Sequence, residues 1–198
     1  MAEPSAHSVR INWDHPEALH GVFLEIYALG VLLAGGSGVG KSEIALDLIS
    51  RGHRLIADDA VEIVQPARGV LLGRCPEVLR DFMEVRGLGV INIRRLYGDA
   101  AITDMQRLDL VIHIDNLAAG HDAPADEAAD RLSGRRATRV ILGVPVPEIF
   151  LRAKLGHNQR ALVEAACRDH WLRLFSYRAD EDFGQGQQAA IESGQKWN

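Results

Sequence analysis

Short apolar runs separated by glycine-rich breaks recur along the first third of the chain. Residues 21–28 and 31–35 predict two strands joined by a tight turn at 29–30. Residues 42–50 then place Ile44 with Leu48 and Ala45 with Ile49 on one face of a helix, and a glycine ends that pattern. The pattern predicts a strand, a glycine loop and a helix in succession.

The rest of the chain predicts mainly strands, with a short helical stretch at 76–83 and a longer helix at 158–175. The strand-like runs lie at 53–59, 61–65, 70–74, 108–115 and 137–146.

One domain is expected, because 198 residues with 47% hydrophobic and 25% charged side chains are typical of a single globular unit. Residues 1–19 lack periodicity and predict an N-terminal arm. Residues 20–175 form the predicted domain, and residues 176–198 predict a polar, mobile tail. No internal repeat is evident.

A formal net charge of −5 argues against a protein whose main function is to bind nucleic acid. Cys75 and Cys167 lie far apart, in no zinc-ligand or redox spacing, which fits a reducing cytosol. Neither a signal peptide nor an apolar run of membrane-spanning length is present in the sequence. A cytoplasmic location without membrane or nucleic-acid partners is therefore expected.

One segment fits the phosphate-binding pattern G-x-x-x-x-G-K-[ST], in which backbone N–H groups wrap phosphate oxygens at a helix N-terminus. Lys41, one of only three lysines, would span the terminal phosphates, and the Ser42 hydroxyl would ligate Mg²⁺. The motif alone leaves ATPase, GTPase, small-molecule kinase and protein kinase open. Its residues are Gly35, Gly36, Ser37, Gly38, Val39, Gly40, Lys41 and Ser42.

Two predicted strands end in acids that could serve the metal. Asp115 is the more ordinary candidate, whereas the adjacent Asp58 and Asp59 could direct one carboxylate to metal and the other to an incoming hydroxyl. Glu84 and Arg86 lie beside a glycine bend and are candidates for a metal or phosphate contact. His20, just before the first strand, is compatible with either a structural or a catalytic role.

Taken together, two segments closely resemble the catalytic domain of the bifunctional HPr kinase/phosphorylase family. The shared marks are a His-Gly pair before the P-loop strand, GKSE, RGHRL-x-ADD and E-[VI]-RGLG, all in order. The likeness is strong over residues 20–116 and weaker to about 175. It implies an α/β P-loop fold of the HPr kinase type, similar to the nucleotide-binding core of phosphoenolpyruvate carboxykinase.

The resemblance implies an enzyme that uses ATP or pyrophosphate to phosphorylate a serine of HPr, a bacterial phosphocarrier protein. Phosphorolysis of phosphoserine by orthophosphate is the implied reverse reaction. By position, Asp59 would be the base, His20 and Lys41 would contact the transferring phosphate, and Arg131 would complete the catalytic set. Ser42 with Glu84 would hold Mg²⁺, so Asp115 becomes structural.

The resemblance also implies a homo-oligomer, with a hexamer as the expected form. The family normally has an N-terminal domain before this one, so a short natural form or an isolated catalytic domain is expected, without regulation through that domain.

A family loop reading PVRPGRN is matched to residues 145–151, where both loop arginines are missing. This match predicts a kinase that is a poor phosphorylase, unless Arg152, Lys154 or Arg160 supplies the charge. An ATP-dependent small-molecule kinase and a catalytically reduced nucleotide-binding module remain as alternatives.

Overall fold

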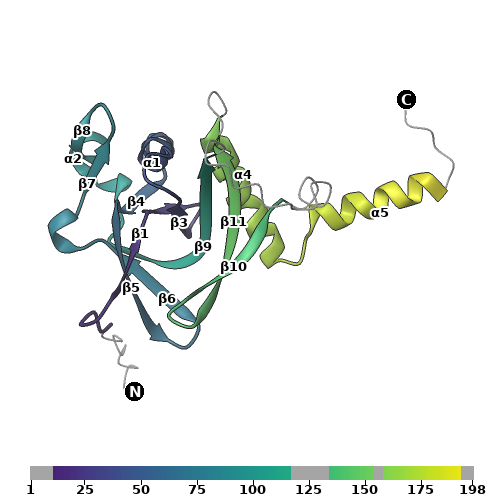
Figure 1. The fold of residues 1–198 in the computed structure, drawn as a ribbon, viewed down its shortest axis with the longest axis horizontal. Coiled ribbons are helices and arrows are strands. Elements are labelled where there is room, and N and C mark those ends of the chain that lie inside the picture. Colours follow the sequence, from purple (N-terminus) through teal and green to yellow (C-terminus); the bar gives the residue numbers. More distant parts are fainter. Residues whose placement is uncertain (1–10, 117–133, 154–157, 193–198) are drawn as a thin grey trace, which may run out of the picture.

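The computed structural model describes residues 11–116, 134–153 and 158–192, whose strands form a nine-stranded sheet and a separate two-stranded hairpin (Figure 1). No helix among these residues is long and apolar enough to cross a membrane. The strands are β1 (Glu17–His20), β2 (Val22–Ile26), β3 (Leu29–Ala34), β4 (Arg54–Ala57), β5 (Ala60–Ala67), β6 (Val70–Arg74), β7 (Phe82–Val85), β8 (Gly89–Asn92), β9 (Met105–Asn116), β10 (Arg136–Ile141) and β11 (Val144–Ala153). The helices are α1 (Lys41–Ile49), α2 (Ile93–Tyr97), α4 (Gln159–Leu174) and α5 (Ala179–Glu192), with 3₁₀ turns η1 (Glu77–Leu79) and η2 (Asp99–Ala101).

Strand β3 lies at the centre of the large sheet, antiparallel to β2 and parallel to β9. Its six residues are all buried. Val31 and Leu33 pack on the helical side, whereas Leu32 and Ala34 belong to a second cluster on the opposite face. A strand covered on both faces requires a continuous apolar run, which is why residues 31–34 show no polar alternation.

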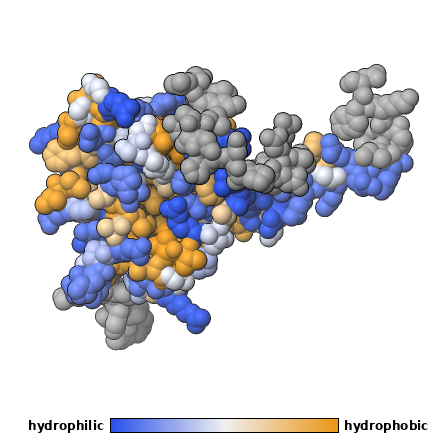
Figure 2. Space-filling model, in the orientation of Figure 1, coloured by the Kyte–Doolittle hydropathy of each residue, from blue (hydrophilic) through white to orange (hydrophobic). Residues whose placement is uncertain are grey.

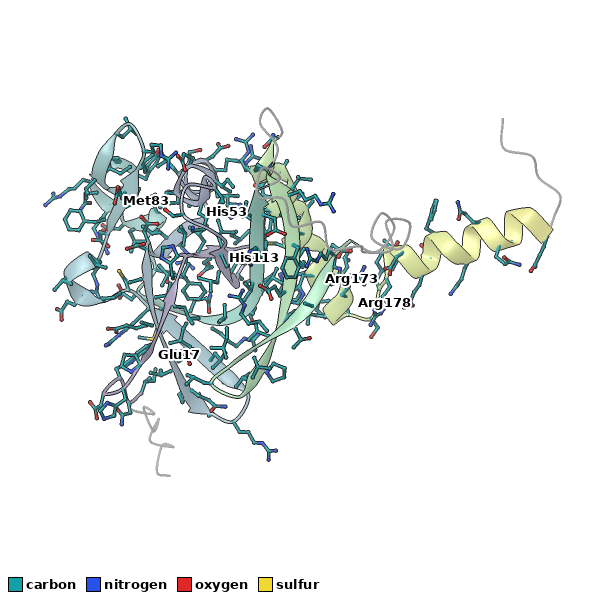
Figure 3. The ribbon with its side chains drawn as sticks, viewed as in Figure 1. Glu17, His53, Met83, His113, Arg173 and Arg178 are labelled. Atoms are coloured by element: carbon teal, nitrogen blue, oxygen red, sulfur yellow. The ribbon has the colours of Figure 1, made fainter. Side chains whose placement is uncertain are left out.

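Helices α1 and α4 pack on the same hydrophobic cluster beside the central strands (Figure 1). Ile44 and Leu48 of α1 and Val163 and Cys167 of α4 are buried in it. Met83 of the hairpin also points into this cluster (Figure 3). The P-loop helix is therefore fixed by packing against both a sheet and a second helix.

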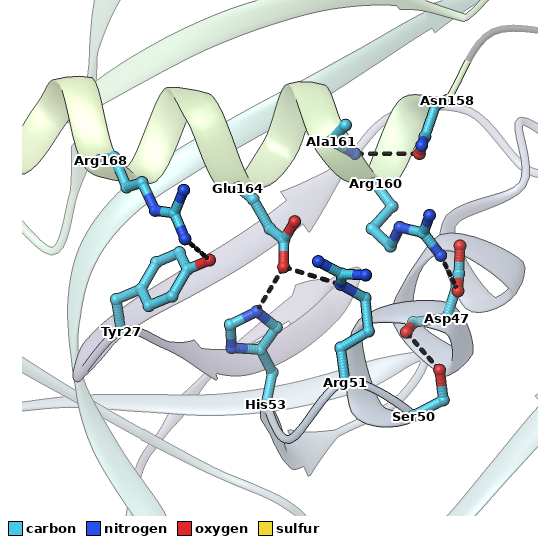
Figure 4. A network of polar contacts seen from close by, with 10 residues as sticks. All are labelled: Tyr27, Asp47, Ser50, Arg51, His53, Asn158, Arg160, Ala161, Glu164 and Arg168. Carbon is cyan, nitrogen blue, oxygen red and sulfur yellow. Dashed lines mark hydrogen bonds and ion pairs between the residues drawn. The ribbon is translucent and has the colours of Figure 1, made fainter.

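Charged contacts join α4 to the segment that follows α1 (Figure 4). The carboxylate of Glu164 accepts hydrogen bonds from His53 Nε2 and Arg51 Nε, each at 3.1 Å. Burial alone would raise the pKa of Glu164, but the hydrogen bonds and the charges of His53 and Arg51 together outweigh it and lower the pKa. Arg160 pairs with Asp47 of α1, which adds a second link.

The turn between β2 and β3 lies at Tyr27 and Ala28, so the turn predicted at 29–30 is wrong by two residues. Both turn residues have positive φ, at 51° and 64°. The Trp171 indole N–H donates to the Tyr27 carbonyl at 3.1 Å, and Arg168 donates to the Tyr27 hydroxyl at 2.6 Å. Contacts from α4, distant in sequence, therefore stabilise a conformation that non-glycine residues rarely adopt.

Two other predicted elements also differ in the structure. The single strand predicted over 137–146 is a hairpin of β10 and β11, reversed at Leu142 and Gly143, whose φ values are 47° and 75°. The helix predicted over 76–83 is only the 3₁₀ turn η1, after which the chain enters β7. Predicted strands at 53–59, 61–65, 70–74 and 108–115 and helices at 42–50 and 158–175 are confirmed within a few residues.

The two ends contain more structure than the sequence pattern indicates. β1, at the end of the predicted arm, pairs antiparallel with β5. Helix α5 lies within the predicted tail and extends away from the sheet (Figures 1 and 3). Arg173 of α4 donates to Asp180 at 2.7 Å, which ties the start of α5 to the end of α4.

Replacing Glu164 by Gln is expected to lower the free energy of unfolding by about 1–3 kcal/mol, because His53 and Arg51 lose a charged acceptor in a buried position. Urea denaturation measures the change. Glu181→Gln removes the exposed partner of Arg178 and is the matched control, with an expected loss of about 0.5 kcal/mol or less. Equal losses in the two variants would contradict a structural role for the Glu164 network.

Glu164→Gln should also change how the stability of the fold decreases at acidic pH. Because the pKa of Glu164 is lower in the folded protein, its carboxylate stabilises the fold above the ordinary glutamate pKa, and this contribution is lost as the pH falls through the lowered value. Between these values the wild type should lose more stability than Glu164→Gln, as measured by thermal unfolding at a series of pH values.

Candidate functional site

The glycine loop leaves the carboxyl end of β3 and leads directly into α1. Gly35 has φ 133°, and a Cβ on it would lie 2.4 Å from the carbonyl oxygen of Ile114 in β9. Gly40 has φ 91° and precedes the first helical residue, with no side chain capping that end of α1. The backbone N–H groups at the start of α1 thus face the loop, where an anion would be stabilised.

Lys41 is buried at the centre of this loop. Its ammonium donates to the carbonyl oxygens of Gly35 and Gly36, both at 3.0 Å. The positive charge is therefore held inside the ring of backbone groups that would surround a phosphate.

Arg86 brings a second cation to the loop from the β7–β8 hairpin. Its Nη2 atom lies 2.9 Å from the position that a Cβ on Gly38 would occupy, so a larger residue at 38 would have to displace the guanidinium. The sequence singles out the segment that contains Arg86, but only the fold shows that the hairpin lies against the P-loop.

Pairing of β1 with β5 brings His20 to Asp59. His20 is opposite Ala60 in the register, and its Nδ1 lies 3.0 Å from Asp59 Oδ1. The Asp59 side chain is 75% exposed, so its carboxylate is open to a second molecule.

The two adjacent acids point to different surroundings because the chain reverses between β4 and β5. Asp59 has φ 66°, and the N–H of Ala60 donates to the Asp58 carbonyl at 2.8 Å. Asp58 is buried, with Oδ1 3.4 Å from Ser42 Oγ and Oδ2 accepting from the Glu84 N–H at 2.9 Å. Burial raises the pKa of Asp58, helped by the neighbouring charge of Asp59 and opposed by the Glu84 N–H.

These groups converge on one polar cleft of about 170 Å³. The structure thus brings His20 of β1, Lys41 and Ser42 of α1, Asp59 of the β4–β5 turn and Glu84 of β7 together from four separate parts of the fold. Asp58 also lines the cleft; the sequence offers the Asp58–Asp59 pair for a metal and a hydroxyl, whereas the resemblance assigns a role to Asp59 alone. The remaining lining residues are Gly21, Val22, Ser37, Gly38, Gly40, Glu43 and Arg86.

The side chains of Ser42, Asp58 and Glu84 line the cleft with oxygen atoms that could ligate a hard divalent cation. Within the described ranges, no group of three or more His, Cys, Asp or Glu side chains is arranged to hold a metal by itself. A cation there would therefore need phosphate oxygens and water as further ligands, as Mg²⁺ commonly does.

Two expectations about neighbouring residues have different outcomes. Asp115 does not line the cleft and pairs with His113 at 3.3 Å, in agreement with a structural role. Arg131 lies outside the described residues, so its assignment stays a prediction.

The loop matched to residues 145–151 is not a loop. These residues lie within β11 and pair with β10 and β9. Within this segment, Glu148 is buried and pairs with Arg139 at 2.7 Å. Because an apolar and proline-containing run can also be a buried strand, the sequence alone misplaced the segment. The prediction of a poor phosphorylase therefore loses its basis.

Comparison with known proteins gives the same family as the motifs. The family model described as "HPr Serine kinase C-terminal domain" matches residues 13–187. HPr kinase/phosphorylase of Azoarcus sp. (strain BH72) is 46% identical over 84% of this chain, and that of Xylella fastidiosa (strain M12) is 51% identical over 78%. These alignments cover 51% and 48% of the relatives, so the chain spans about half the length of the curated relatives it matches.

A solved structure, the Hpr(Ser) kinase/phosphatase from Coxiella burnetii, superposes with a TM-score of 0.73 at 31% sequence identity. The match covers 84% of this chain and 98% of that one, and it extends the likeness from motifs to the whole α/β architecture. With a family model that matches most of its length and relatives near half identity, the chain belongs to the HPr serine kinase C-terminal domain family.

Proposed function

We propose that this chain transfers a phosphoryl group from ATP or pyrophosphate to a serine of HPr. The observation that carries the proposal is the division of the two acids: Asp58 is buried beside Ser42, whereas Asp59 is exposed beside His20. An exposed base next to a P-loop suits an acceptor hydroxyl that arrives on another molecule. The names of the relatives support HPr as that molecule.

In the forward direction, the hydroxyl of the acceptor serine would give its proton to Asp59 as its oxygen bonds to the terminal phosphorus. Lys41, at the centre of the loop, would balance charge on the transferring group and on the leaving phosphate. His20, 3.0 Å from Asp59, would orient that carboxylate and face the same phosphate. Most of the catalysis would thus come from positioning and charge.

In the reverse direction, orthophosphate would attack the phosphoserine phosphorus, and Asp59 would return the proton to the serine oxygen. The products are then pyrophosphate and HPr with an unmodified serine side chain. Arg86, whose guanidinium lies against the P-loop, and the proposed Arg131 would favour the approach of two anions.

Ser42, Asp58 and Glu84, whose side chains line the cleft, would hold Mg²⁺. When bound, Mg²⁺ would neutralise part of the phosphate charge. A cytoplasmic location and a homo-oligomer, with a hexamer as the expected form, stay predictions.

Asp59→Asn should lower serine phosphorylation by about 10²–10⁴-fold and leave nucleotide affinity nearly unchanged, because the base contacts the acceptor and not the phosphate loop. Transfer of labelled phosphate from ATP to purified HPr measures the rate. Asp115→Asn is the matched control and should retain wild-type activity. Near-normal transfer by Asp59→Asn would remove the base assignment.

Lys41→Ala should weaken nucleotide binding roughly ten-fold or more and also reduce turnover, since the ammonium serves both the ground state and the transferring group. Calorimetric titration with a non-hydrolysable ATP analogue measures the affinity, and circular dichroism tests the fold. A folded variant with unimpaired affinity would refute the proposed contact.

Nucleotide binding in the presence of Mg²⁺ should tighten as the pH rises through the raised pKa of Asp58, because the cation competes with the proton on that carboxylate. Asp58→Asn should weaken Mg²⁺-dependent binding and remove this part of the pH dependence. Titrations with Mg²⁺ at several pH values test it. An unchanged pH profile in the variant would exclude Asp58 from the cation site.

A further inference from the structure

The β7–β8 hairpin carries apolar side chains on the face that points away from the core. Along β7, Met83 and Val85 are buried, whereas Phe82 and Glu84 alternate with them on the outward side. On β8, Val90 stands opposite Glu84 in the register and is 69% exposed. A buried face and an exposed apolar face on one short hairpin is unusual for a surface that meets only water.

This outward face adjoins the cleft. Glu84 lines the cleft, and Val90 is its direct cross-strand neighbour, at a spacing where side chains on one face touch. The hairpin turn places Leu88, 67% exposed, two residues from Arg86, which also lines the cleft. Phe82, Leu88 and Val90 are called the lip below.

The apolar surface continues beyond the lip along the same end of the molecule, where hydrophobic residues gather over β7, β8 and α2 (Figure 2). A gathering of exposed apolar residues marks an interaction surface more often than isolated apolar residues do. The further exposed apolar residues of this stretch are Val78, Leu79, Leu96 and Tyr97.

The position of the lip identifies what would cover it. The cleft is polar and, at about 170 Å³, small, so phosphates and a cation would occupy much of it. A small acceptor that reached Asp59 would leave the lip in water. A second copy of this chain seated on the lip would crowd the mouth of the cleft, where Asp59 is exposed.

We propose that the lip docks an apolar surface beside the acceptor serine of the phosphorylated protein. This inference rests on the proposed function and adds to it a specificity surface outside the phosphate site. Burial of Leu88 and Val90 against the acceptor protein would hold its serine over Asp59, and it would select a protein acceptor over a small molecule.

The test uses Val90→Thr and the double variant Leu88→Gln with Val90→Thr in the full chain. Val140→Thr on β10 is the matched control, because Val140 is also a strand valine, 68% exposed, and does not line the cleft. Three quantities are measured: KM and kcat for HPr, the Kd for HPr whose acceptor serine is replaced by alanine, and the Kd for an ATP analogue.

The double variant is expected to raise KM and Kd for HPr roughly ten-fold each, with kcat and nucleotide affinity changed by less than about two-fold. Val90→Thr should show part of that effect and Val140→Thr none. Unchanged HPr affinity in the double variant, or an equal loss of affinity in Val140→Thr, would overturn the proposed role of the lip in binding HPr.

A change of oligomeric state in gel filtration, with HPr affinity intact, would overturn the proposal by assigning the surface to self-association. Failure of the proposed function is distinguished because the wild-type chain would then not phosphorylate HPr, whichever residues form the lip.

Discussion

The close parallel pairing of β3 with β9 is the constraint on which the site depends. It leaves no room for a side chain at Gly35, where a Cβ would lie 2.4 Å from the Ile114 carbonyl oxygen, so only glycine fits at the point where the chain leaves the sheet for the P-loop. Because β3 is buried on both faces, neither its register nor its direction can shift without exposing core residues. The starting point of the P-loop is thus set by the sheet and not by the loop itself.

A single backbone reversal points the side chains of two adjacent aspartates in different directions. The left-handed φ of Asp59 ends β4 and starts β5, so Asp58 turns toward Ser42 and the hairpin, whereas Asp59 turns toward His20 and solvent. Burial beside Ser42 raises the pKa of Asp58, whereas the Asp59 side chain is 75% exposed. One acid is suited to a cation and the other to a proton, although their side-chain chemistry is the same.

The sequence predicted the part of the site that neighbouring residues determine. The glycine loop and α1 follow from spacing and from glycine, which tolerates positive φ. The Tyr27 turn, the Leu142 reversal and the position of residues 145–151 did not follow, because contacts across the fold determine them: α4 holds Tyr27, and β9 holds β11. The resemblance singled out Asp59, and the fold shows why its side chain is the exposed one: the chain reverses at the positive φ of Asp59, and pairing of β1 with β5 then places His20 beside it.

The β7–β8 hairpin carries both residues of the cleft and the exposed apolar residues proposed to bind the acceptor protein. Its backbone N–H at Glu84 donates to Asp58, its turn carries Arg86 to the P-loop, and its outward face carries Val90. The phosphate loop alone cannot select an acceptor, since it contacts only groups that many nucleotide-binding proteins share. Selection must come from surface outside that loop, and among the elements bordering the cleft this hairpin joins polar groups facing the phosphates to apolar groups facing solvent. We expect an acceptor that fits the apolar face to be held close to Asp59, the carboxylate proposed to take its proton.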